Sequence, residues 1–292
     1  MLEEDIKQEL VQLKEFHLLP SDFQSSDLVQ GIYNHPLWPL FFWRRRISHQ
    51  QRPDPEIPYV IKLNPRNVLE VGSAYGRFSQ KLLHAFKQEG VETDLFGIEV
   101  NPHFKGFAEK FASDNPELSA VKTTFDDIVN APLHFKQNFF DCIVVPMHTL
   151  PGMSPEFIEK SLEVIKSILA PNGHLVFSYN KHFSFDKHKN ISRMPRVSGE
   201  LIPELGQEPV GSVAYDFPEK DTMVGYSRVG YRIFYRFDRQ MKPIESSVAR
   251  TEYHMIEPSH LEALLTNNHF KINDLAEEQF SYIYTVSPDR SA

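Results

Sequence analysis

Short apolar runs alternate with amphipathic helical patterns through the middle of the chain, from residue 59 to residue 180. Between the runs, apolar residues recur at helical spacing, as Phe78, Leu82 and Phe86 do. This alternation predicts a parallel sheet with helices on both faces. The expected strands, each short and bounded by polar or turn residues, lie at 67–71, 94–100, 119–123, 139–145 and 174–179.

The N-terminal part of the chain follows a different pattern. Ile6, Leu10 and Leu13 recur at helical spacing among charged residues, which predicts one amphipathic helix. An aromatic segment with both tryptophans follows. Residues 51–58 are rich in proline and polar residues, and this composition predicts a linker.

A third pattern begins after residue 180. Apolar and polar residues alternate from Val229 to Phe237, and a second strand is expected to end near Met255, which indicates an antiparallel lid. Ser259 and Glu262 have the spacing of a capping box at the start of a helix. Two closing strands are expected at 271–275 and 280–286. The predicted organisation is an N-terminal helical and aromatic cap (1–58), a main domain (59–180 and 258–292) and an inserted substrate lid (181–257).

The composition of the chain argues against several classes of function. The chain of 292 residues has a formal net charge of −8, which argues against a general nucleic-acid binder, because such proteins need a basic face. Its one cysteine, Cys142, excludes intrachain disulfides and cysteine-based metal sites, and no metal-ligand cluster stands out. The acidic start is unlike a signal peptide and no apolar run is long enough to span a membrane, so a cytoplasmic protein without membrane attachment is expected.

The segment Glu70-Val71-Gly72-Ser73-Ala74-Tyr75-Gly76 lies where the first strand turns into the first helix. Small residues at such a turn let the backbone approach a ligand, and the helix start offers free N–H groups. A dinucleotide site has the spacing G-x-G-x-x-G, which is absent here. A tight turn without a ligand is the alternative interpretation of this segment.

This segment resembles the first motif of the class I S-adenosylmethionine-dependent methyltransferases, acid-x-Gly-x-Gly-x-Gly, with Ala74 in place of the middle glycine. Further matches are Glu99 at the end of the second strand, Phe140-Asp141 at the start of the fourth, and the turn at 169–178. The resemblance covers about residues 59–287. It implies a doubly wound, Rossmann-like α/β fold: a seven-stranded, mainly parallel sheet with helices on both faces, a helical N-terminal cap and an antiparallel lid insertion.

The resemblance also implies S-adenosylmethionine as the cofactor and S-adenosylhomocysteine as the product. In the family, the acid at Glu99 accepts both ribose hydroxyls, and the residues after the third strand flank the adenine. Thr124 stands where the family often has an acid, and Asp126 is an alternative. The implied cofactor-binding residues are Glu70, Gly72, Ser73, Ala74, Gly76, Phe78, Glu99, Val100, Thr124, Phe125, Asp126, Pro146 and Tyr33.

Methyl transfer needs an aligned acceptor and the exclusion of water, with a base only where the acceptor is protonated. We expect the acceptor site at the C-terminal ends of the strands. His148 and Tyr179 are the candidate catalytic residues, and a structural loop histidine is the alternative for His148. Val145-Pro146-Met147-His148 lacks the Asn/Asp-Pro-Pro-aromatic motif of the nucleic-acid and glutamine-methylating members. The candidate substrate-binding residues are His148, Asn180, Tyr226, Tyr231 and Arg44.

The lid and the closing helix resemble glycine-type and sugar-amine N-methyltransferases. This resemblance implies methyl transfer to a nitrogen or oxygen of a small molecule, with a homodimer as one option for the assembly of the protein. Two alternatives remain: a protein or peptide methyltransferase that docks its substrate on the aromatic N-terminal segment, and a catalytically inactive, methyltransferase-like protein that binds a partner.

Overall fold

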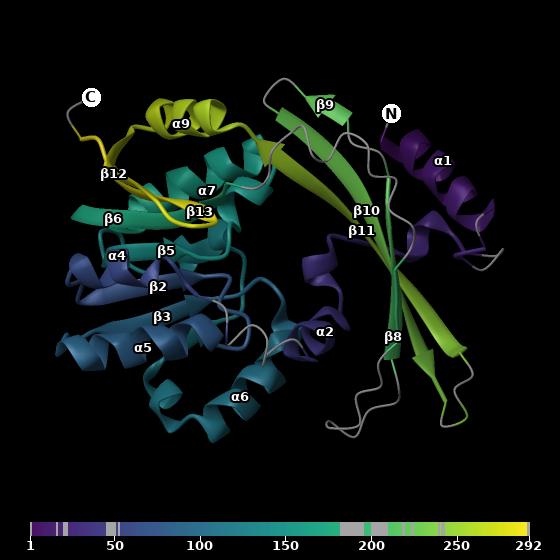
Figure 1. Ribbon diagram of the computed structural model, residues 1–292, viewed down its shortest axis with the longest axis horizontal. Helices are drawn as coiled ribbons and strands as arrows, with labels where there is room; N and C mark the ends of the chain where they lie inside the picture. The colour runs from purple at the N-terminus through teal and green to yellow at the C-terminus, as the bar shows by residue number, and fades with distance from the viewer. Residues whose placement is uncertain are drawn as a thin grey trace. The chain divides into compact units, whose positions relative to one another are not determined.

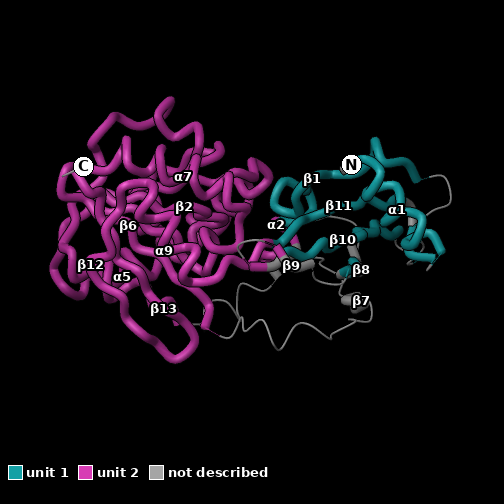
Figure 2. The backbone as a smooth tube through the Cα atoms, turned by 90° about the horizontal axis from the view of Figure 1, so that it is seen from above, with its two compact units in different colours: residues 1–38, 188–220, 227–253 teal, residues 39–187, 221–226, 254–292 magenta. Residues whose placement is uncertain are grey.

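The computed structural model describes the residues 2–15, 17–19, 23–44, 51, 53–181, 196–199, 210–217, 220–222, 225–238, 240 and 243–290. The chain divides into two compact units (Figure 2). Unit 1 comprises residues 1–38, 188–220 and 227–253, and unit 2 comprises residues 39–187, 221–226 and 254–292. This division groups the N-terminal segment with most of the predicted lid, and it assigns residues 39–58 to the α/β unit.

Unit 2 contains a seven-stranded sheet in the order β12-β13-β6-β5-β2-β3-β4 (Figure 1). The first five strands in sequence pair in parallel, and β13 pairs antiparallel with β6 and with β12. The expected α/β fold with a mainly parallel sheet is therefore confirmed. The strands are β2 (Asn67–Val71), β3 (Asp94–Ile98), β4 (Lys122–Thr124), β5 (Phe140–Val145), β6 (Leu169–Asn180), β12 (Phe270–Glu277) and β13 (Ser281–Pro288).

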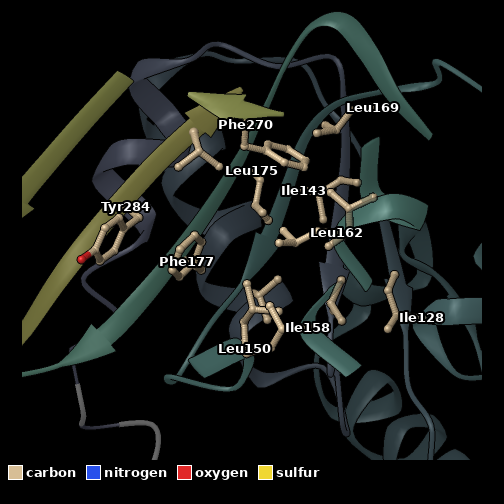
Figure 3. Packing of buried hydrophobic residues seen from close by; sticks show 14 of the residues in the cluster. Ile128, Ile143, Leu150, Ile158, Leu162, Leu169, Leu175, Phe177, Phe270 and Tyr284 are labelled. Atoms are coloured by element: carbon tan, nitrogen blue, oxygen red, sulfur yellow. The ribbon is translucent and has the colours of Figure 1, made fainter. Parts of the chain in front are cut away.

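Side chains alternate along each strand, so the apolar strands of this sheet present apolar residues on both faces. Helices cover both faces and bury these residues. On one face, Leu69 and Ile143 belong to a buried cluster with residues of α7 (Pro155–Ile168) and α9 (Pro258–Asn267). Figure 3 shows Ile143 of this cluster beside Leu162 of α7. On the other face, Val68 and Cys142 pack with α4 and α5. The helices of unit 2 are α4 (Ile57–Lys62), α5 (Arg77–Glu89), α6 (Lys105–Asp114), α7 (Pro155–Ile168) and α9 (Pro258–Asn267), with short 3-10 helices at Pro102–Phe104, Pro116–Ala120, Ile128–Leu133 and Leu150–Gly152. The helix α2 (Trp38–Arg44) lies at the boundary in sequence.

Three local predictions need correction. The weak third strand begins only at Lys122, because residues 116–120 form a 3-10 helix that starts at a proline. The helix α9 begins one residue before Ser259, with Glu257 as its N-cap and no side-chain capping bond, so the predicted capping box is absent. Residues 51–58 are not a plain linker, because Asp54 and Glu56 are buried.

Unit 1 is built on a second sheet in the order β1-β11-β10-β8-β7, with β9 paired to β10. The two strands that the sequence predicted, at Val229–Phe237 and ending near Met255, correspond to β10 and β11, which are neighbours in this sheet. The strand β8, which the sequence did not predict, pairs antiparallel with β7 and β10. The helix α1 (Leu2–Glu15) packs Ile6, Leu10 and Leu13 against this sheet. The strands are β1 (Leu28–Gln30), β7 (Arg196–Gly199), β8 (Val210–Asp216), β9 (Lys220–Thr222), β10 (Gly225–Phe237) and β11 (Pro243–Ile256), and two 3-10 helices span Ser25–Asp27 and Ile32–Asn34.

A buried ion pair fixes α1 within unit 1. The Arg250 side chain donates from Nε to Glu9 Oε2 at 2.8 Å and from Nη2 to Glu9 Oε1 at 3.2 Å. The Tyr231 hydroxyl donates to the same Oε2 at 2.6 Å. Burial and the Glu9 carboxylate raise the pKa of Tyr231, so the phenol stays protonated.

We predict that Gly97→Ala destabilises unit 2. A Cβ at Gly97 in β3 would lie 2.9 Å from both Cβ and Oγ of Ser73, in the turn after β2. Overpacking of this kind costs about 1–3 kcal/mol of unfolding free energy, measurable by urea denaturation. The control is Gly106→Ala in α6, where a Cβ meets no atom within 4 Å. An unchanged unfolding free energy for Gly97→Ala would contradict this packing.

Candidate active site

The strand order places the topological switch point of the sheet between β2 and β5. The chain runs from β2 outward to β3 and β4 on one side, and later to β5 and β6 on the other. Ligands of open α/β sheets bind outside the carboxyl ends of the strands at such a point. The segments at this edge are the loop Gly72–Gly76, Glu99 to Asn101, Thr124 to Asp126, and Pro146 to Thr149.

The loop after β2 adopts a left-handed backbone conformation at three positions, and two of them are glycines. Gly72 and Gly76 have φ angles of 78° and 93°, in the left-handed region where a side chain is strained. Ala74 also has a positive φ, 49°, which costs a non-glycine residue about 1–2 kcal/mol. A Cβ built on Gly72 meets no atom within 4 Å, so the backbone at Gly72 is open to a ligand.

Glu99 ties this loop to the end of β3. Its Oε2 accepts the N–H of Ala74 at 2.8 Å, and its Oε1 accepts the N–H of Asn101 at 2.9 Å. The side chain is buried, with 6% exposed, and burial raises the pKa of Glu99 while the two N–H groups lower it. Each oxygen keeps a second lone pair for a ligand donor.

Glu70 precedes the loop by two positions in sequence, and its side chain is fully buried in β2. Its Oε2 accepts a hydrogen bond from the Ser79 hydroxyl in α5. Burial raises the pKa of Glu70 from 4.5 to about 8, against the lowering influence of Ser79 and Arg77. Glu70 therefore supports the loop from inside the unit, and Phe78 is likewise a buried core residue of α5.

The residues predicted to lie beside the adenine differ in what their side chains do: some present apolar surface, and others make polar contacts within the chain. Val100 is 39% exposed directly after Glu99, and Phe125 is half-buried after β4, so both present apolar surface at the edge. The backbone carbonyl of Thr124 accepts the Glu99 N–H at 2.9 Å. The Asp126 carboxylate binds Asn130 and His134, and these contacts lower its pKa to about 2.

The loop after β5 is also held in a left-handed conformation. Met147 and His148 have φ angles of 58° and 59°. Each such residue costs about 1–3 kcal/mol and persists only where its surroundings hold it. Pro146, just before them, is buried. The Nδ1 atom of His148 is buried and has no hydrogen-bond partner among the described residues. Burial lowers the pKa of His148, which keeps its imidazole neutral.

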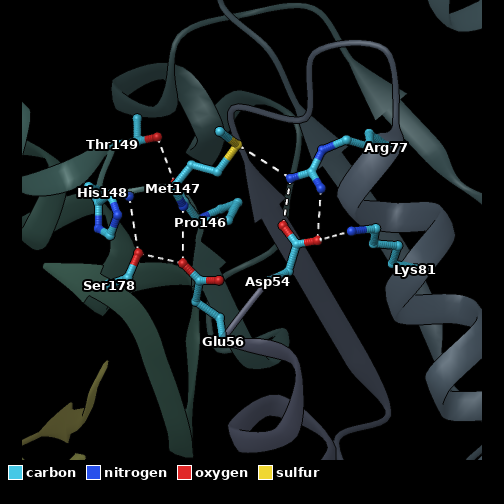
Figure 4. A network of polar contacts seen from close by, with 9 residues as sticks. All are labelled: Asp54, Glu56, Arg77, Lys81, Pro146, Met147, His148, Thr149 and Ser178. Carbon is cyan, nitrogen blue, oxygen red and sulfur yellow. Dashed lines mark hydrogen bonds and ion pairs between the residues drawn. The ribbon is translucent and has the colours of Figure 1, made fainter. Parts of the chain in front are cut away.

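Sequence reasoning missed a polar network that holds this loop (Figure 4). Asp54 accepts hydrogen bonds from Arg77 Nη1 and Nη2 at 2.8 and 2.5 Å, and from Lys81 Nζ at 2.7 Å. Arg77 also lies 3.3 Å from the sulfur of Met147. Glu56 accepts the N–H of Met147 at 3.0 Å and the hydroxyl of Ser178. The only sequence signal was the presence of acids in a proline-rich segment.

An aromatic cluster supports the same loop from α2 and α6. Trp43 contacts Tyr75 edge-on, with ring centroids 5.1 Å apart, and Phe111 at 6.0 Å. Phe42 contacts Tyr75 and Phe104. The aromatic N-terminal segment thus contributes packing around Tyr75, the residue between Ala74 and Gly76.

Tyr179 and Asn180 lie at the end of β6. The Tyr179 hydroxyl donates to the carbonyl of Ile256 at 3.0 Å, and its ring is buried, so the structure gives this side chain a packing role. Asn180 is half-buried at the last position of the strand. Catalysis by Tyr179 and substrate binding by Asn180 stay predictions.

Four further predicted site residues either belong to unit 1 or have side chains that the structure does not describe. Tyr33 belongs to unit 1, where it is 53% exposed and touches Trp38 edge-on. Tyr231 is buried in unit 1 with its hydroxyl on Glu9. The side chains of Arg44 and Tyr226 lie outside the described residues. Roles for these four residues stay predictions.

The described residues contain no group of three His, Cys, Asp or Glu side chains placed to hold a metal ion. Within the same part of the chain, no helix is both long and apolar enough to cross a membrane.

We predict that Glu70→Gln flattens the pH dependence of stability. The folded state holds the Glu70 proton more tightly than the unfolded chain, because its pKa is raised from 4.5 to about 8. This contribution is full below pH 4.5 and is lost as pH rises through about 8, by up to about 1.4 kcal/mol per pH unit. Urea denaturation from about pH 5 to pH 8 measures it. Equal slopes for wild type and Glu70→Gln would contradict the assignment.

Part of the chain matches a known protein family. Residues 68–173 match a family model described as a methyltransferase domain. No curated protein sequence matches the chain significantly.

Among solved structures, a sugar N-methyltransferase from Streptoalloteichus has 13% sequence identity and a TM-score of 0.62, over 93% of this chain and 98% of that chain. An S-adenosylmethionine-dependent methyltransferase from Clostridium acetobutylicum has 13% identity and a TM-score of 0.58, over 85% and 97%. An amino pentose methyltransferase from Micromonospora echinaspora, with S-adenosylmethionine bound, has 15% identity and a TM-score of 0.51, over 84% and 96%.

At these identities the structural neighbours establish the fold. The matched residues 68–173 run from β2 to the turn within β6, and so contain the loop Gly72–Gly76, Glu99 and the β5 loop. The family model thus identifies residues 68–173 as a methyltransferase domain, and the structural neighbours, among them an S-adenosylmethionine-dependent methyltransferase, share its fold.

Proposed function

We propose that this protein transfers a methyl group from S-adenosylmethionine to a nitrogen or oxygen of a small-molecule acceptor. One observation carries the proposal. The buried Glu99 carboxylate and the glycine-containing loop meet at the switch point of the sheet, where Gly72 is open to a ligand. Support for the acceptor class comes from structural neighbours that methylate sugars, and it extends to this chain only as part of the proposal.

The residues present fit this cofactor. The free lone pairs of Glu99 suit the two ribose hydroxyls, because a carboxylate accepts hydrogen bonds and cannot donate them. The open backbone at Gly72 and the N-terminus of α5 leave room for the amino-acid end. Val100 and Phe125 offer apolar surface for the adenine. Bound there, the cofactor supplies a methyl group that its sulfonium has already activated.

The chain itself must place the acceptor in line with that methyl group and exclude water. His148 follows β5 at the same edge of the sheet, and its buried Nδ1 has no partner among the described residues. Because burial lowers the pKa of His148, the ring is neutral near physiological pH and can accept a proton at its unprotonated nitrogen. An acceptor amine or hydroxyl would lose its proton to this ring.

We predict that wild-type protein binds S-adenosylhomocysteine and that two substitutions weaken this binding. Gly72→Arg fills the open side of the loop and strains a φ of 78°, so the dissociation constant should rise by at least about 100-fold. Glu99→Gln removes a charged hydrogen-bond acceptor, which corresponds to roughly 10- to 100-fold. Isothermal titration calorimetry measures both values, and the ligand-induced rise in melting temperature checks them.

The matched control is Glu89→Gln, an exposed residue at the end of α5, which should bind like wild type. Wild-type affinity in both site variants would show that the cofactor site is misplaced. Methylation of a protein in lysate without any labelled small product would favour a protein acceptor. Binding without turnover on a broad panel of amines and alcohols would favour an inactive partner-binding protein.

A further inference from the structure

The segment before β2 contains a carboxylate whose placement the cofactor site does not explain. Glu56 is the N-cap residue of α4, a position where a side chain often caps its own helix. The Glu56 side chain makes no such bond. Its carboxylate instead reaches the carboxyl edge of the sheet, where it is 1% exposed.

At that edge, Glu56 and Ser178 hold two successive backbone N–H groups. Glu56 Oε1 accepts the N–H of Met147 at 3.0 Å and the hydroxyl hydrogen of Ser178. The Ser178 oxygen in turn accepts the N–H of His148 at 3.0 Å. Figure 4 shows these three contacts converging on the loop after β5. Both residues of the loop have positive φ angles, so this pair of acceptors holds a conformation that the backbone would otherwise avoid.

The same segment is also anchored to the helix that follows the cofactor loop. Asp54 binds Arg77 and Lys81 of α5, and the Asp54 carboxylate is buried. Arg77 Nη2 also lies 3.3 Å from the Met147 sulfur. Residues 54–56 therefore link the start of α5, next to Gly76, to the loop that contains His148.

We propose that Glu56 is a positioning residue for the transfer reaction. Through its own Oε1 and the Ser178 hydroxyl it fixes the turn Met147–His148, and so sets the direction of the His148 ring toward the acceptor. This inference rests on the proposed function, because it gives His148 the role of receiving the acceptor's proton. Glu56 is not itself a catalytic residue, since its contacts are to the backbone and to Ser178.

The groups around Glu56 are consistent with a role that depends on the position of its acceptor oxygen and not on its charge. Burial and the neighbouring Asp54 raise the pKa of Glu56, whereas the bonds from Ser178 and Met147 lower it. Oε2 of Glu56 is buried without a partner among the described residues. The charged and titratable groups packed around this turn are Asp54, Glu56, Arg77, Lys81 and His148 itself. An acceptor at Oε1 serves equally well in a carboxylate, a carboxylic acid or an amide.

The test uses the full chain with Glu56→Gln, Glu56→Ala and Ser178→Ala. Glu56→Gln keeps an acceptor at Oε1, whereas the two alanine variants remove one link each. Ser161→Ala and Glu278→Ala are controls: Ser161 is a buried serine of α7 with no hydrogen-bond partner among the described residues, and Glu278 accepts the Tyr59 hydroxyl away from the β5 loop.

Three quantities are measured for every variant. Calorimetry with S-adenosylhomocysteine gives the affinity of the cofactor site. Turnover on the panel amine or alcohol that wild type methylates fastest gives kcat and KM. Histidine NMR, with the His148 signals assigned by their loss in His148→Gln, gives the titration midpoint of the His148 ring.

We expect Glu56→Ala and Ser178→Ala to lower kcat at least about tenfold, with cofactor affinity within about threefold of wild type. The His148 midpoint should rise toward its ordinary value of 6.5, because the loosened turn hydrates the ring. Glu56→Gln and both controls should behave like wild type. If Glu56→Ala does not fold, Ser178→Ala tests the same link by removing one oxygen atom.

Several results would overturn the inference. An unchanged His148 midpoint in Ser178→Ala overturns it even where no panel compound is methylated. Equal losses in Glu56→Gln and Glu56→Ala would show that the charge matters and the acceptor geometry does not. Failure of wild type to bind S-adenosylhomocysteine is a different result, because it refutes the proposed function and leaves the His148 measurement as the test of the turn.

Discussion

The central constraint in this structure is the need to satisfy backbone N–H groups at the carboxyl edge of the sheet. Buried N–H groups are costly without a partner, and left-handed residues persist only where their surroundings hold them. Glu99 accepts the N–H of Ala74, and Glu56 accepts the N–H of Met147. Two buried carboxylates thus hold the two loops that flank the switch point, one after β2 and one after β5.

These carboxylates also give the site its electrostatic character. Asp54, Glu56, Glu70 and Glu99 are all buried, and Asp54 binds the cations Arg77 and Lys81. Burial raises the pKa of Glu56, Glu70 and Glu99, so each tends toward its neutral form unless a donor or a cation approaches. These residues therefore act on the two loops through hydrogen bonds and ion pairs within the chain.

Sequence reasoning was accurate where structure is decided locally. The strands at 67–71 and 139–145 and the glycine-containing loop follow from short-range patterns, and the structure confirms the fold that they predict. It failed for residues 51–58. Proline and polar residues in that segment have the composition of a linker, but Asp54 is buried because Arg77 and Lys81, more than twenty positions away in sequence, bind it. Only the folded chain reveals such partners, and the same holds for the contacts of Glu56 with Met147 and Ser178.

The most direct test of this account is amide hydrogen exchange of the wild-type protein with and without S-adenosylhomocysteine. Binding protects amides that the ligand covers or whose local opening it suppresses. The account predicts slower exchange in the loop Gly72–Gly76, at Glu99 to Asn101, and in the β5 loop at Met147 and His148. Protection confined to other parts of the chain, or no change at a saturating ligand concentration, would contradict the placement of the site at this edge of the sheet.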